Sequence, residues 1–205
     1  MPEFPGGRTD PTGCAVSKLA DMIFFRKHGL CPRWLCFTFD NAFRRLVQDP
    51  DRIISPYVGQ GDTVLDVGPG IGYFTIPAAK RVGAGGRVIA ADIQEAMLRG
   101  IATRAGRAGV RDRIVLHLSA PGEIYAGDPV DFILAFWMVH EVPETERFFR
   151  QLRAALKPAG RLLLAEPKLH VSRSQFAGET AAAQRAGFRL RQEPSVPLSH
   201  AALLG

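Results

Sequence analysis

The chain has 205 residues, of which 46% are hydrophobic and 22% are charged. These proportions are ordinary for a globular domain, and the length suits one domain that buries its core without disulfides or metals. Three cysteines are too few and odd in number for a disulfide framework, and no apolar run approaches the length that crosses a bilayer. We therefore expect a cytoplasmic protein with no membrane span.

The net charge of +6 allows an anionic partner such as a nucleic acid. However, the arginines are scattered over the predicted helices instead of forming a run, as at Arg99, Arg104, Arg107 and Arg150. Solvent-facing helix surfaces account for most of them. The charge pattern therefore favours a small-molecule partner over a nucleic acid.

Residues 1–50 are expected to form a helical cap or lid segment over the main domain, residues 51–205. Apolar residues at helical spacing predict a helix over 16–28 and a short helix over 41–48, with an aromatic loop between them. Because these elements precede the predicted sheet, they can only pack over it.

The aromatic loop supplies an apolar surface that suits a substrate pocket, from Trp34, Phe37 and Phe39. Cys31 and Cys36 lie in the same loop and lack further ligands at a zinc spacing, so we expect no metal site. Small buried side chains are the simpler interpretation of the two thiols, and contact with a soft acceptor such as a metalloid is the alternative.

From residue 63 onward, strands alternate with helices, which predicts an α/β fold with a parallel sheet covered on both faces. The predicted strands are 63–67, 87–92, 114–118, 131–136 and 161–165, and the helices between them are 73–82, 94–107 and 144–156. A capping box at Ser172 and Gln175 opens a helix to Ala186, with Gly187 as its C-terminal glycine. Two final strands, 188–191 and 200–204, are close enough in sequence to pair antiparallel.

A glycine-rich turn joins the first predicted strand to its helix, through Gly68, Gly70 and Gly72. Glycine adopts positive φ and lets the backbone approach a ligand closely, so this turn can present free N–H groups to a bound molecule. Asp92 ends the next strand, where a carboxylate can accept hydrogen bonds from both hydroxyls of a ribose. The pattern therefore predicts a site for an adenosyl ligand.

The spacing Asp66-x-Gly68-x-Gly70-x-Gly72 differs from a dinucleotide fingerprint, because Tyr73 stands where that pattern has its third glycine. It resembles motif I of the class I S-adenosylmethionine (SAM) dependent methyltransferases. The resemblance continues in residues 131–136, 156–164 and 186–188, and covers about residues 51–205. Within the family, the chain is similar to the small-molecule, quinone-biosynthesis branch.

The resemblance implies a Rossmann-like sheet of seven strands, mostly parallel, with helices on both faces and the last strand antiparallel beside the fifth. It also implies SAM as the cofactor and S-adenosylhomocysteine as its product. Asp66 and the glycine turn would hold the methionine part, Asp92 the ribose, and Ile93 the adenine. Ser119 stands where the family normally has an acid for the adenine amino group. The implied cofactor site is Asp66, Gly68, Pro69, Gly70, Gly72, Tyr73, Asp92, Ile93, Ser119, Ala120 and Phe136.

Methyl transfer needs chiefly an in-line approach of the acceptor in a water-poor pocket, and a base only if the acceptor loses a proton. His140 is the first candidate for that base and Glu141 the second, ahead of His28 and His170. Trp137 and Met138 just before them are expected to line the substrate pocket, together with the aromatic loop.

Three other functions compete with methylation of a small molecule. A SAM-binding partner or sensor without activity is the first, and Ser119 in place of an acid is its support. An RNA methyltransferase is the second, disfavoured because no Asn-Pro-Pro-Tyr type motif follows the fourth strand. A nicotinamide dehydrogenase is the third, opposed by Tyr73.

Overall fold

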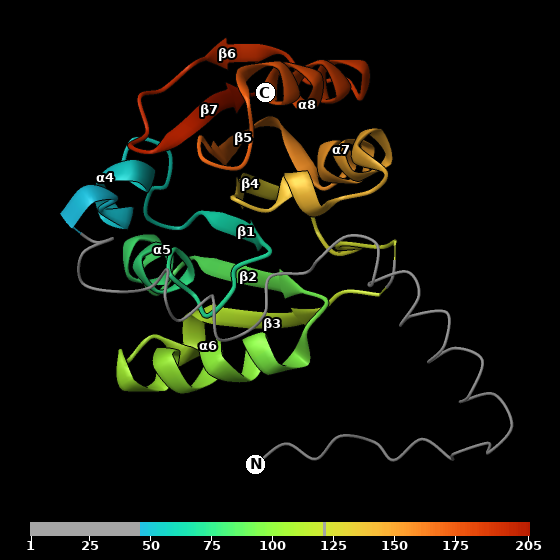
Figure 1. Cartoon of the computed structure of the whole chain (residues 1–205). Helices are drawn as coiled ribbons and strands as arrows, with labels where there is room; N and C mark the ends of the chain where they lie inside the picture. Colours follow the sequence, from blue (N-terminus) through green and yellow to red (C-terminus); the bar gives the residue numbers. More distant parts are fainter. Residues whose placement is uncertain (1–45, 121) are drawn as a thin grey trace, which may run out of the picture. The chain divides into compact units, whose positions relative to one another are not determined.

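The structure, a computed structural model, describes residues 46–205 except residue 121. Figure 1 shows its helices and strands. The helices are α4 (Pro50–Ile54), α5 (Thr75–Val82), α6 (Glu95–Arg107), η1 (Arg111–Arg113), η2 (Val139–Glu141), α7 (Thr145–Ala154) and α8 (Arg173–Arg185). The strands are β1 (Thr63–Val67), β2 (Arg87–Asp92), β3 (Ile114–Leu118), β4 (Val130–Phe136), β5 (Leu156–Pro167), β6 (Leu190–Gln192) and β7 (Ser199–Leu204).

All seven strands join one sheet in the order β3-β2-β1-β4-β5-β7-β6. The first five strands are parallel, whereas β7 runs antiparallel between β5 and β6. The fold class that the resemblance implied is therefore confirmed, including the antiparallel last strand beside the fifth. Among the described residues, no helix is both long and apolar enough for a membrane span.

Buried apolar side chains form a core on each face of the sheet. One core includes Ile76 of α5 and Ile101 of α6, and the other includes Phe149 of α7 and Ala183 of α8. Figure 1 shows α4 and α5 on one side of the sheet and α7 on the other. The central strands are buried on both faces, which is why β4 reads as a continuous apolar run.

The predicted boundary between the helix over 144–156 and the strand after it is wrong. Helix α7 ends at Ala154, and Leu156 already pairs with Val130 in the extended strand β5. The apolar side chain of Leu156 continues the helical spacing, but it is buried as part of the sheet. Lys157 then donates to both carboxylate oxygens of Asp131, at 2.7 and 2.8 Å, so the start of β5 is fixed to β4.

The capping box at the start of α8 is confirmed. The backbone N–H of Gln175 donates to the Ser172 hydroxyl at 3.3 Å, and the Gln175 side chain accepts from the Ser172 N–H at 2.8 Å. Gly187 has φ +98°, a left-handed conformation that favours glycine, and the chain leaves the helix there as predicted.

The predicted cap segment, residues 1–50, lies almost entirely outside the described residues. This applies to Trp34, Phe37 and Phe39, to Cys31 and Cys36, and to His28. The described part begins beside the sheet, since the Gln48 side chain donates to the Pro197 carbonyl at 2.6 Å.

Candidate functional site

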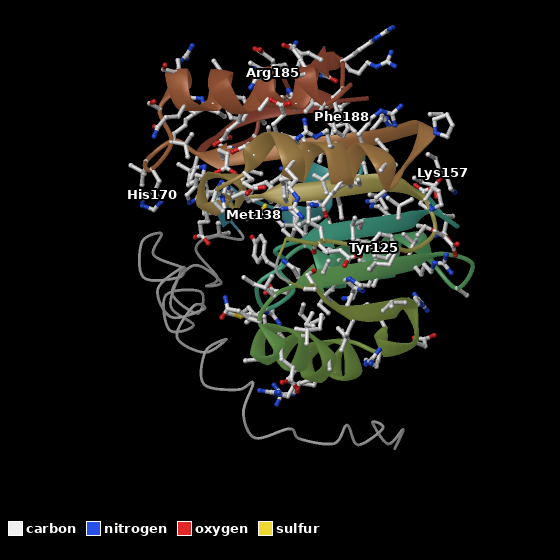
Figure 2. The ribbon with its side chains drawn as sticks, turned by 90° about the vertical axis from the view of Figure 1, so that its right-hand side faces the viewer. Tyr125, Met138, Lys157, His170, Arg185 and Phe188 are labelled. Carbon is white, nitrogen blue, oxygen red and sulfur yellow. The ribbon has the colours of Figure 1, made fainter. Side chains whose placement is uncertain are left out.

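The carboxyl ends of the parallel strands meet at one edge of the sheet. Strand order reverses between β1 and β4, because the chain moves outward to β2 and β3 on one side and to β4 and β5 on the other. Figure 2 shows Met138, which follows β4, toward the left with His170, and Lys157, near the start of β5, at the right. Ligands of such sheets bind at the carboxyl-end edge, beside the reversal point.

The turn after β1 lies at this reversal point and needs glycine at three places. Gly68, Gly70 and Gly72 have φ of +62°, +55° and +86°, in the region that other residues rarely adopt. A Cβ on Gly68 would lie 3.1 Å from the Met138 side chain, and one on Gly72 would lie 3.2 Å from Ile101. A Cβ on Gly70 would meet no atom of the described protein within 4 Å. Gly70 is therefore the glycine that faces open space.

One backbone hydrogen bond and one from an arginine side chain hold the turn in place, and two backbone donors are left for a ligand. The Gly68 N–H donates to the Ala91 carbonyl of β2 at 3.0 Å, and Arg104 of α6 donates to the Ile71 carbonyl at 3.0 Å. The N–H groups of Gly70 and Ile71 donate to no acceptor within the described part of the chain. Such unsatisfied N–H groups before a helix form an anion or polar-ligand site.

Asp66 is buried beneath the turn. Its Oδ2 accepts from the Thr75 hydroxyl at 2.6 Å, which ties the end of β1 to the first residue of α5. Burial raises the pKa of Asp66 to about 7, despite the hydrogen bond from Thr75. The structure thus gives Asp66 a role in fixing the turn, and Thr75 is a partner that sequence reasoning did not identify.

Asp92 lies at the end of β2, directly beside the glycine turn in the sheet register. Its Oδ1 accepts from the Gln94 N–H at 2.8 Å, so one carboxylate oxygen shapes the start of α6. Burial raises the pKa of Asp92 to about 6.

Ser119 follows β3, and its N–H donates to the Asp92 carbonyl at 3.0 Å, so the two residues are neighbours. The Ser119 hydroxyl donates to the Ile124 carbonyl at 2.8 Å, which leaves its oxygen only as an acceptor for a ligand amino group. Ala120 next to it is exposed and bridges to Glu123.

Two large apolar side chains are exposed at the ends of neighbouring strands. Ile93 is 45% exposed after β2, and Leu118 is 55% exposed at the end of β3, where it is in register with Asp92. Exposed side chains of this size beside a predicted site suit the face of a flat ring. Leu118 was missed from sequence because it reads as one more residue of an apolar strand.

The aromatic residues around the turn divide into core and edge positions. Tyr73 is buried, packs edge-on against Phe74, and donates its hydroxyl to the Gln48 carbonyl at 2.6 Å. Phe136 is also buried, with its ring 4.4 Å from that of Phe74. The structure therefore gives Tyr73 and Phe136 core positions, and Pro69 in the turn is buried as well.

Trp137 is half-buried and has φ +61°, a strained conformation for a large side chain. Its backbone N–H donates to the Ala165 carbonyl at 2.7 Å, and its indole N–H donates to the Ser199 hydroxyl at 2.8 Å. These bonds hold the loop after β4 against β5 and β7. Met138 follows in the loop and places its side chain against Gly68.

His140 lies in η2, and Nδ1 of its ring is hydrogen-bonded to Oε2 of Glu166. Glu166 is fully buried in β5, and its Oε1 accepts from the Val139 N–H at 2.7 Å. The hydrogen bond to Glu166 raises the pKa of His140 above its usual value. Glu141, the second predicted base, is half-buried, and its Oε1 is 4.0 Å from His140 Nε2. Only the fold brings His140 and Glu166 together.

Comparison with known proteins agrees with this geometry. Residues 64–160 match the model of a methyltransferase domain family. The chain is 33% identical over 159 residues to a ubiquinone/menaquinone biosynthesis C-methyltransferase of Escherichia fergusonii, covering 74% of this chain and 61% of that protein. The chain thus spans less than two thirds of the length of that relative.

Solved structures share the fold. A SAM-dependent methyltransferase from Aquifex aeolicus superposes with a TM-score of 0.75 at 24% identity, covering 85% of this chain and 98% of that one. Fibrillarin of Aeropyrum pernix, solved with natively bound SAM, gives a TM-score of 0.58 at 18% identity, covering 72% of this chain and 67% of that one. The chain therefore has the fold of the SAM-dependent methyltransferases, and its residues 64–160 are similar to a methyltransferase domain family.

Proposed function

We propose that this protein binds SAM at the glycine turn and transfers its methyl group to a small-molecule acceptor. The observation that carries the proposal is the open space over Gly70, in a turn whose neighbouring strand ends in Asp92. A nucleoside ligand needs both features, since one end of it approaches a bare backbone and its ribose needs a carboxylate.

The residues present fit this cofactor. The free N–H groups of Gly70 and Ile71 suit the polar amino-acid end, and the second carboxylate oxygen of Asp92 suits the ribose. Ile93 and Leu118 are exposed where an adenine ring would need apolar contact. Bound SAM supplies a methyl group on a positively charged sulfur, which is already activated for transfer. The protein has then to bind SAM and the acceptor, orient them toward each other and exclude water.

Asp66 acts in this proposal through the turn. Its hydrogen bond with Thr75 fixes the start of α5 and with it the positions of the glycine backbone. Trp137 and Met138 belong to the loop that borders the turn, so we place them between cofactor and acceptor. A residue as large as Trp137 in a left-handed conformation is typical of a loop shaped for function.

The acceptor that best suits the relatives is a small aromatic compound. The curated relatives are named as C-methyltransferases of quinone biosynthesis, so a ring carbon is the atom we expect to be methylated. Methylation of a ring carbon replaces a ring proton, and the acceptor must therefore lose that proton to a base. His140 is our candidate for this base.

Isothermal titration calorimetry with SAM and with S-adenosylhomocysteine tests the cofactor. We expect both to bind at one site per chain, and absence of binding by both would refute the proposal. Mass spectrometry of reaction mixtures with SAM and reduced 1,4-naphthoquinone then tests transfer to an aromatic ring. Binding without any methylated product from this and other aromatic acceptors would favour the alternative of a catalytically silent SAM-binding module.

A further inference from the structure

The buried carboxylate beneath His140 suggests how the protein prepares a base. We propose that Glu166 is a positioning residue that holds the His140 ring with its proton on Nδ1, so that Nε2 takes the proton that the acceptor loses. The inference rests on the proposed methyl transfer and narrows the acceptor to compounds that lose a proton when methylated, such as phenols and aromatic ring carbons. Thioethers and metalloids without a proton to lose would not need this arrangement.

Both oxygens of Glu166 are engaged, which fixes the carboxylate. Oε1 accepts from the Val139 N–H at 2.7 Å, and Oε2 is bonded to Nδ1 of His140. The side chain has no exposed surface, and its backbone is paired with His200 of β7 within the sheet. A carboxylate accepts hydrogen bonds, so the nitrogen facing it must carry the proton. The lone pair of the neutral ring therefore belongs to Nε2.

The ring of His140 borders a hollow between η2, α7 and α8. The hollow has a volume of about 370 Å³, and the histidine side chain is 27% exposed. Its lining is partly apolar and partly charged, and includes Val139, Val171, His140, Glu146, Glu179 and Arg185. The loop that carries His140 also carries Met138, which lies against Gly68. His140, which lines the hollow, is therefore two residues along the chain from Met138, whose side chain lies against the glycine turn.

The groups around His140 favour the charged ring that forms when the proton arrives. Glu166 contacts it from β5, Glu141 lies 4.0 Å from Nε2 in η2, and Glu179 acts on it electrostatically from α8. His170, in the loop after β5, places a second imidazole ring on this side, with its centre 6.4 Å from that of His140. The pKa of His140 is raised, first by the hydrogen bond to Glu166.

Glu179 is the second carboxylate that faces this cluster. Its Oε2 is buried and has no hydrogen-bond partner among the described residues. Burial raises the pKa of Glu179 to about 7, and the charge of Glu166 adds to the shift. Glu146 and Arg185 line the same hollow, but Arg185 donates to Glu146 at 2.9 Å, so they compensate each other. In the proposed transfer the acceptor proton passes to Nε2, the methyl group takes its place on the acceptor with S-adenosylhomocysteine as the leaving group, and the other ring proton stays on Nδ1, hydrogen-bonded to Glu166.

Nitrogen NMR of the histidine ring tests this inference without an acceptor. Long-range ¹H–¹⁵N spectra of the full chain, with His140 assigned through His140→Gln, report which ring nitrogen is protonated. We expect wild type to hold its neutral ring as the Nδ1–H form, with a titration midpoint above about 6.5. In Glu166→Gln the side-chain amide oxygen can still accept from the Val139 N–H. The amide NH₂ then faces Nδ1 of His140. The proton should therefore move to Nε2, and the midpoint should fall by about one pH unit or more.

Glu146→Gln is the matched control, because it removes a carboxylate from the same hollow without contacting His140. Its His140 spectrum should equal that of wild type, and SAM should bind all three proteins within about twofold, since Glu166 is not part of the cofactor site. An Nε2–H ring in wild type, or an unchanged His140 in folded Glu166→Gln, would overturn the inference. Should Glu166→Gln not fold, the wild-type spectrum alone decides. Failure of SAM to bind wild type would instead reject the proposed function while leaving the ring assignment standing.

Discussion

Substitution of Gly70 should affect SAM binding much more than it affects the stability of the protein. Gly70→Ala adds a methyl group where φ is +55° and where nothing of the described protein lies within 4 Å. The left-handed conformation costs an L-residue about 1–2 kcal/mol, and the lower entropy of the unfolded alanine chain offsets about 0.4–1 kcal/mol. We therefore expect a loss of about 1 kcal/mol in the free energy of unfolding, because no steric contact adds to it.

The same methyl group should strongly reduce SAM binding. A ligand that approaches the bare backbone would meet the new Cβ, and overpacking typically costs about 1–3 kcal/mol. Since about 1.4 kcal/mol corresponds to a tenfold change in Kd, calorimetry should show affinity for SAM weaker by about tenfold or more. Urea unfolding of the same preparation measures the stability change.

Gly109→Ala provides the matched control. Gly109 has φ +67° and also has nothing within 4 Å, but it lies in the turn after α6, far along the chain from the glycine turn. Both variants should lose similar stability, and only Gly70→Ala should lose affinity for SAM. Equal SAM affinity in the two variants would refute the reasoning that the space over Gly70 holds the ligand.

Three further substitutions test other parts of the account. Asp92→Asn keeps an oxygen for the Gln94 N–H, so calorimetry should show SAM binding weakened by about tenfold, with the free energy of unfolding changed by less than about 1 kcal/mol; unchanged affinity would remove Asp92 from the site. Burial raises the pKa of Asp66 from 3.8 to about 7, so the folded protein keeps a proton that the unfolded chain releases, and stability falls as the pH rises from about 4 through 7. In Asp66→Asn, the free energy of unfolding in urea should fall less steeply between pH 5 and 6.5, by about 1 kcal/mol per pH unit. An unchanged slope would contradict the raised pKa of Asp66. Ser172→Ala removes the cap of α8 and should lower the free energy of unfolding by about 1 kcal/mol while leaving SAM affinity as in wild type; a loss of affinity would mean that α8 contributes to the cofactor site.

The bounds of the first three strands and the glycine turn were predictable because local sequence determines them. Apolar runs between glycines and charges delimit β1, β2 and β3, and Gly68, Gly70 and Gly72 occur where φ is positive. The end of α7 was not predictable, since Leu156 satisfies helical spacing and strand pairing equally well. Only its partner in β4, distant in sequence, decides between the two.

The polar contacts of the site depend on the fold in the same way. His140 and Glu166 are 26 residues apart, and they meet because η2 follows β4, whose last residue pairs with the residue before Glu166 in β5. Asp66 was identified from its motif, but its bond to Thr75 depends on how the turn closes. Tyr73 was predicted at the cofactor from its place after the last glycine, but the bond of its hydroxyl to the Gln48 carbonyl depends on the fold.

The most direct test of the account is a crystal structure of the protein with S-adenosylhomocysteine. We predict that the amino-acid end of the ligand lies over Gly70, that its ribose hydroxyls are bonded to Asp92, and that its adenine contacts Ile93 and Leu118. A ligand bound elsewhere, with the glycine turn and Asp92 left untouched, would contradict the central claim.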